Sequence, residues 1–87
     1  MSFVAKVFSE KSNLLWLVRG DHKSRKAWWF VFVKPFKLNS FKAALGSDSM
    51  LLTEYGDIIE CGYGENPTSA DIEFIRQKGF KLDEALF

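Results

Sequence analysis

The chain has 87 residues, of which 47% are hydrophobic and 16% aromatic, and its formal net charge is +1. This composition predicts one folded domain over residues 1–87 and excludes a disordered chain. The longest apolar run, residues 27–33, is far shorter than the roughly 20 residues of a membrane helix. The single cysteine, Cys61, cannot form an internal disulfide. We therefore expect a cytoplasmic protein that does not bind a membrane.

Charge is divided unevenly along the chain. Residues 1–46 have a balance of +7 and residues 47–87 a balance of −6. Such a division predicts that one part of the surface is basic and another acidic. Three interpretations are open: the two halves fold against each other, copies of the chain associate, or a basic face meets an acidic partner.

Three strands are predicted in the first part of the chain, over residues 2–9, 14–19 and 27–33. All three are rich in β-branched or aromatic side chains. The turn "EKSN" separates the first two, and a polar loop over residues 20–26 separates the second from the third. Pro35 ends the third strand, because proline donates no hydrogen bond to a sheet. We expect an antiparallel meander.

A helix and a shorter turn follow. "KLNSFKAALG" places Leu38, Phe41 and Leu45 on one helical face, and Gly46 suits the left-handed conformation that ends a helix. "SDSMLLTEYG" predicts a short helix or turn that ends at Gly56.

A fourth strand and a second long helix complete the chain. In "DIIECGYG", alternation places Ile59, Cys61 and Tyr63 on one face. "NPTSADIEFIRQKGF" predicts a helix, capped either by Asn66 or by Thr68. The fold class is therefore α+β: a small antiparallel sheet, made of a three-stranded meander plus a fourth strand, with two or three helices packed on one face.

The strand over residues 27–33 is apolar on both faces. Helices on one face would leave an aromatic surface in water, which is typical of an interface. We expect a protein partner, either a second copy in a homodimer or another subunit of a complex. The predicted interface residues are Trp16, Trp28, Phe30 and Phe32. If the helices take the other face, Trp29, Val31 and Val33 replace them; alternatively, the tail that contains Phe87 covers the exposed face.

Basic residues surround the predicted loop between the second and third strands. Nucleic-acid-binding proteins combine such residues with aromatic side chains on which bases stack. The near-neutral net charge argues against a dedicated nucleic-acid-binding protein. A small nucleic-acid-binding module is therefore the alternative function, and its residues would be Arg19, Lys23, Arg25 and Lys26.

The segment "ECGYGENPTS" joins the fourth strand to the last helix. Backbone amides at a helix N-terminus bind anions, and glycines allow a phosphate to approach closely. The candidate anion-binding residues are Gly62, Gly64, Asn66, Thr68 and Ser69. The glycine motif is incomplete and Glu65 would repel a phosphate, so a tight turn before a capped helix is the simpler interpretation.

The sequence contains no catalytic or metal-binding pattern. His22 and Cys61 are the only histidine and the only cysteine, and they lie far apart in the sequence. A zinc site needs about four closely spaced ligands, and the carboxylates of residues 54–65 are typical of a solvated face. We expect a non-catalytic protein without a metal or cofactor.

Three segments carry a resemblance to known proteins. "AWWFVFV", "FKAALGS" and "YGDIIECGYGENP" before a helix resemble a pattern in small bacterial proteins without an assigned function. The resemblance covers residues 20–80. It implies no activity, ligand or catalytic residue.

Overall fold

The computed structural model describes residues 2–9 and 13–82. The elements, in chain order, are β1 (Val4–Val7), β2 (Leu15–His22), β3 (Arg25–Val33), the 3-10 helix η1 (Pro35–Lys37), α1 (Leu38–Ala44), the 3-10 helix η2 (Leu52–Glu54), β4 (Gly56–Tyr63) and α2 (Ser69–Gln77). This order confirms the α+β class. No helix in the described part of the chain is long and apolar enough to span a membrane.

The sheet is an antiparallel meander with the strand order β1-β2-β3-β4. Strands β2 and β3 are longer than predicted, so the polar loop between them shrinks to two residues, Lys23 and Ser24. Their φ angles are 52° and 63°, as in the type I′ turn, whose twist matches that of the flanking strands. The turn brings His22 and Arg25 into the ladder as a directly opposed pair.

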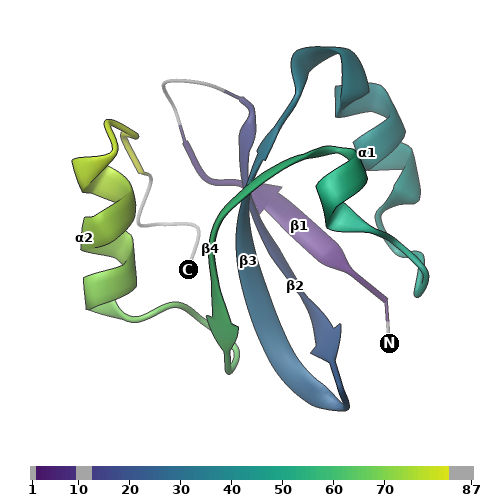
Figure 1. The fold of residues 1–87 in the computed structure, drawn as a ribbon, viewed down its shortest axis with the longest axis horizontal. Coiled ribbons are helices and arrows are strands. Elements are labelled where there is room, and N and C mark those ends of the chain that lie inside the picture. Colours follow the sequence, from purple (N-terminus) through teal and green to yellow (C-terminus); the bar gives the residue numbers. More distant parts are fainter. Residues whose placement is uncertain (1, 10–12, 83–87) are drawn as a thin grey trace.

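The two helices cover opposite faces of the sheet (Figure 1). Ile72 and Ile75 of α2 pack in one apolar cluster with Phe30. Phe41 of α1 packs in a second cluster with Val31. We call these two sides of the sheet the α2 face and the α1 face. The prediction that the helices share one face is therefore wrong, because the neighbouring residues of β3 point to opposite sides and both are apolar.

The predicted interface residues lie in the interior. Trp16, Trp28 and Phe30 expose 7%, 3% and 0% of their surface. Phe32 is half-buried and packs against Phe80, with the ring centroids 5.6 Å apart. These side chains offer no continuous surface to a partner, so the predicted interface is wrong.

Trp16 also lies on the other side of the sheet from Trp28. The β2–β3 register pairs Trp16 with Val31, and both belong to the cluster on the α1 face. In the alternative interface, Val31 and Val33 are fully buried and only Trp29 keeps partial exposure. The tail with Phe87 lies outside the described residues.

The fourth strand is bulged. The β3–β4 pairing shifts between Phe30 and Val31. Ile59 is the extra residue and packs against the cluster on the α2 face, whereas Cys61 and Tyr63 pair with β3 residues that face the α1 side. The prediction that these three β4 residues share a face is wrong, because a bulge interrupts the alternation on which it relied.

Local signals set the ends of the helices. Thr68 caps α2 in a capping box with Asp71: the Thr68 hydroxyl accepts from the Asp71 backbone N–H, and the Asp71 carboxylate accepts from the Thr68 backbone N–H. This settles the two predicted starts in favour of Thr68. Gly46 and Gly79, beyond the ends of α1 and α2, have φ of 95° and 96°, as expected for helix-terminating glycines.

The burial of β3 predicts the outcome of two matched substitutions. Phe30→Ala removes a fully buried ring and should lower the free energy of unfolding by about 3–5 kcal/mol. Phe36→Ala removes a ring that is 78% exposed and should change it by less than about 0.5 kcal/mol. Urea denaturation measures both; similar effects for the two variants would contradict the burial described above.

Candidate functional site

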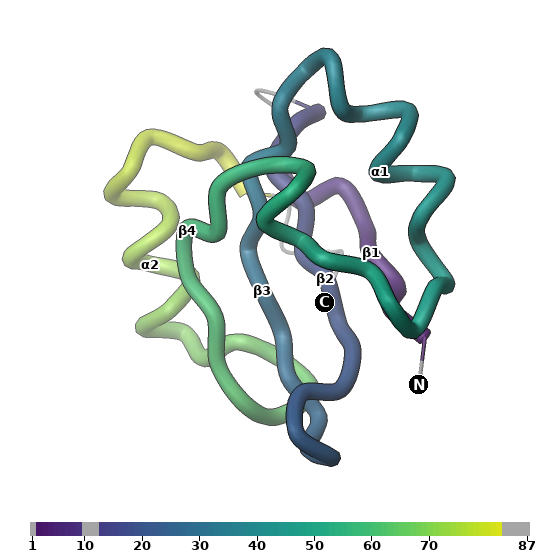
Figure 2. Tube along the Cα trace, turned by 45° about the vertical axis from the view of Figure 1, so that its right-hand side comes forward, coloured from purple at the N-terminus to yellow at the C-terminus, as the bar shows by residue number. Residues whose placement is uncertain are grey.

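The hairpin turn and the end of β4 lie together at one end of the sheet, away from α1 (Figures 1 and 2). The backbone N–H of Gly64 donates to the carbonyl of Lys26 at 2.9 Å and joins the two segments. Hollows of about 290 Å³ and about 200 Å³ open at this end. The first includes Arg19 and Lys26 and the second His22 and Tyr63. The structure thus brings the predicted basic loop and the glycine-containing segment together.

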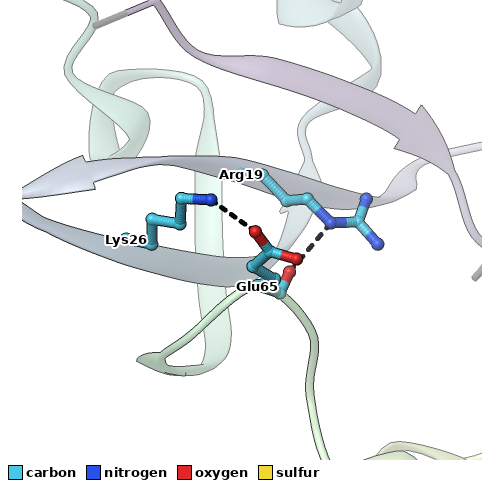
Figure 3. Close-up of polar contacts among 3 residues, drawn as sticks. All are labelled: Arg19, Lys26 and Glu65. Carbon is cyan, nitrogen blue, oxygen red and sulfur yellow. Dashed lines mark hydrogen bonds and ion pairs between the residues drawn. The ribbon is translucent and has the colours of Figure 1, made fainter.

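Four polar residues on the α2 side form the charged cluster, which consists of Arg19, Lys26, Glu65 and Asn66. Figure 3 shows Arg19, Lys26 and Glu65. Arg19 donates through Nε to the Glu65 carbonyl at 3.0 Å and through Nη2 to Oδ1 of Asn66 at 2.5 Å. The Lys26 ammonium forms a hydrogen-bonded ion pair with the Glu65 carboxylate. This cluster fastens residues 65–66 across the hairpin.

The ion pair affects the titration of both partners. The hydrogen bond from Lys26, followed by its positive charge, lowers the pKa of Glu65, and the same two effects of Glu65 raise the pKa of Lys26. Both side chains are strongly exposed, so the pair adds little to stability. Its consequence is electrostatic, because it neutralises one of the cations of the hairpin.

The opposite side of the hairpin has a different character. His22 Nδ1 and the Tyr63 hydroxyl share a hydrogen bond of 2.8 Å, and the Arg25 guanidinium carbon lies 3.9 Å from the centroid of the Tyr63 ring. Tyr63 is 45% exposed. We call this surface the hairpin face; its residues are His22, Arg25, Ala27, Trp29, Cys61 and Tyr63.

Strand alternation separates the charges of the hairpin. Arg19, Asp21 and Lys26 belong to the α2 side, since Arg19 pairs with Trp28 and Asp21 with Lys26. Arg25 belongs to the α1 side. Among the described strand residues, no side chain on the α1 face is acidic. The four residues predicted to bind nucleic acid, Arg19, Lys23, Arg25 and Lys26, therefore do not form one surface; Lys23 lies in the turn itself.

The candidate anion-binding residues have structural partners of their own. A Cβ atom on Gly62 would lie 2.5 Å from Cζ2 of Trp28, so this glycine allows the indole to pack. Gly64 has φ of 107°. Asn66 accepts from Arg19 and Thr68 caps α2.

Ser69 is the first residue of α2. The anion site stays a prediction. The contacts of Gly62, Asn66 and Thr68 fit the simpler interpretation of a turn before a capped helix.

The only histidine and the only cysteine of the sequence line the same hollow. They are not adjacent. Cys61 pairs with Trp29 on β3, and Trp29 pairs with Val18 on β2. His22 lies four residues further along that strand, which corresponds to about 13 Å. No group of three or more His, Cys, Asp or Glu side chains in the described residues could hold a metal ion.

Comparison of the chain with family models, curated proteins and solved structures gives no match.

The carboxyl group of Glu60 lies close to Asp71, in the first turn of α2. Glu60 on β4 has its Oε2 atom buried without a hydrogen-bond partner among the described residues. Burial, and then the negative charge of the neighbouring Asp71, raise the pKa of Glu60. The ionised form of Glu60 is therefore less favourable in the folded chain than in the unfolded chain, and this costs stability above the folded-state pKa.

Glu60→Gln should therefore stabilise the fold at pH 7. The gain should be less than about 1 kcal/mol, because solvent screens the repulsion between Glu60 and Asp71. The gain should disappear as the pH falls below the unfolded-state pKa of about 4.3, where wild-type Glu60 is protonated in both states. Thermal unfolding from pH 4 to pH 8 measures the difference. Asp57→Asn, at an exposed position of the same strand, is the control; a gain for Glu60→Gln that does not change with pH would contradict the assignment.

Proposed function

We propose that the chain is a non-catalytic protein-interaction module that binds an acidic protein surface through the hairpin face. The observation that carries this proposal is the segregation of charge across the hairpin. On the α2 side Glu65 pairs with Lys26, whereas on the hairpin face Arg25 stacks on Tyr63 and no acidic side chain of the described residues joins it. Arg, Tyr and Trp are the residue types that dominate the energetics of interfaces.

The strained turn supports a binding role. Lys23 and Ser24 both have positive φ, which costs of order 1 kcal/mol for each such residue. A turn of Asn and Gly would adopt the same geometry at lower cost. The present turn instead places a cation at the tip, beside Arg25 and His22.

A protein partner is favoured over a nucleic acid. Nucleic-acid affinity grows with the number of phosphates that cations neutralise. Arg19 and Lys26 are already bonded to residues 65–66, which leaves Lys23 and Arg25 of the four residues considered. The partial exposure of Trp29 and Tyr63 keeps base stacking as the second candidate mechanism.

A foreign partner is favoured over a second copy at this face. A two-fold interface brings the same surface of both copies together. Among the described strand residues, this surface carries the cation Arg25 and no acidic side chain, so two copies of it would repel each other. The module would then be a small subunit or adaptor of a larger complex.

Arg25→Gln and Lys26→Gln form a matched pair, because each removes one positive charge from the same hairpin. In affinity capture from a lysate of the producing cells, Arg25→Gln should capture at least tenfold less partner than the wild type, as expected for an interfacial Arg. Lys26→Gln should retain it, because the Lys26 charge is already paired with Glu65. Nuclease treatment tests whether nucleic acid mediates the capture, and light scattering measures the oligomeric state of each variant. Equal capture by both variants, loss of the partner on nuclease treatment, or a dimer that Arg25→Gln dissociates would contradict the proposal.

A further inference from the structure

The hollow on the α1 side lies within the hairpin face. Its volume is about 200 Å³, and its lining residues are His22, Ala27, Trp29, Cys61, Gly62 and Tyr63. Sites for small molecules and cofactors usually measure about 300–1,000 Å³. The hollow is therefore too small for a typical cofactor or nucleotide, and its largely apolar and aromatic lining suits a single inserted side chain.

Arg25 lies over the ring of Tyr63, one of the residues that line this hollow. Its guanidinium is stacked on the ring of Tyr63, and the Tyr63 hydroxyl is held by His22. Stacking occupies the flat face of a guanidinium and leaves the N–H groups along its edge available, in the planar arrangement that matches a carboxylate. No residue of the described chain forms an ion pair with Arg25.

We infer that the hollow receives one apolar side chain, aromatic or branched aliphatic, from an acidic segment of the partner, while Arg25 binds a carboxylate next to it. This inference rests on the proposed function and specifies its recognition element. A polypeptide supplies an apolar side chain and a carboxylate on adjacent residues. A nucleobase fits less well, because Arg25 already covers part of the Tyr63 ring and reduces the surface for stacking.

Cys61 allows a direct test without a mutation at the site. It is the only cysteine in the sequence, it is exposed, and it lines the hollow. The probes are fluorescein-labelled ten-residue Ser/Asp peptides with a central Phe-Asp, Ala-Asp or Phe-Asn pair. Fluorescence anisotropy measures their affinity, and mass spectrometry follows the alkylation of Cys61 by iodoacetamide in their presence.

The Phe-Asp peptide should bind about tenfold more tightly than the Ala-Asp peptide, as expected for burial of an aromatic side chain. The Phe-Asp peptide should slow the alkylation of Cys61, whereas the Ala-Asp peptide should not. Arg25→Gln should lower the affinity for the Phe-Asp peptide by about tenfold and leave the affinity for the Phe-Asn peptide almost unchanged. Lys26→Gln should alter neither affinity.

The outcomes separate this inference from the proposed function. If acidic peptides bind in an Arg25-dependent manner but the Phe-Asp and Ala-Asp peptides protect Cys61 equally, the inference is overturned and the proposed function stands. If Arg25→Gln changes no affinity, or no peptide binds, both are overturned. Stronger protection of Cys61 by a ten-nucleotide oligothymidine than by the Phe-Asp peptide would overturn both in favour of nucleic acid.

Discussion

The rest of the structure depends on strand β3, whose residues 27–33 are all hydrophobic. Successive side chains of a strand point to opposite faces, so covering one face alone would leave an aromatic surface in water. The helices α1 and α2 therefore lie on opposite sides of the sheet, and each completes its own apolar cluster. The central position of β3, between β2 and β4, makes it the common wall of both clusters.

Local patterns in the sequence predicted the elements well. The alternation within β3 correctly separated Trp28 and Phe30 from Trp29 and Val31. Thr68, one of the two predicted caps, correctly marked the start of α2. Each of these features depends on residues within a few positions of each other, so a single sequence contains the necessary information.

The features that the sequence did not reveal depend on residues distant in the chain or on missing turn signals. Arg19 and Glu65 are 46 residues apart, and nothing local links the two. The side on which α1 packs depends on the path of the chain from β3 to β4 rather than on the amphipathic pattern of α1 itself. Lys23 and Ser24 form the turn although neither residue is Asn or Gly, the usual signals for this geometry.

The lengths of the elements decide where a binding surface is left. Helix α1 has seven residues and is about 10 Å long, whereas β3 has nine residues and is about 30 Å long. The helix therefore covers only part of its face, and the turn end of the hairpin stays uncovered. On the α2 side, residues 65–66 close this end by polar contacts with Arg19 and Lys26. On the α1 side, the same end presents Trp29, Tyr63 and Arg25 instead. A short helix on a long apolar strand thus leaves an aromatic and cationic surface, on a side of the sheet to which the described strands direct no acidic side chain.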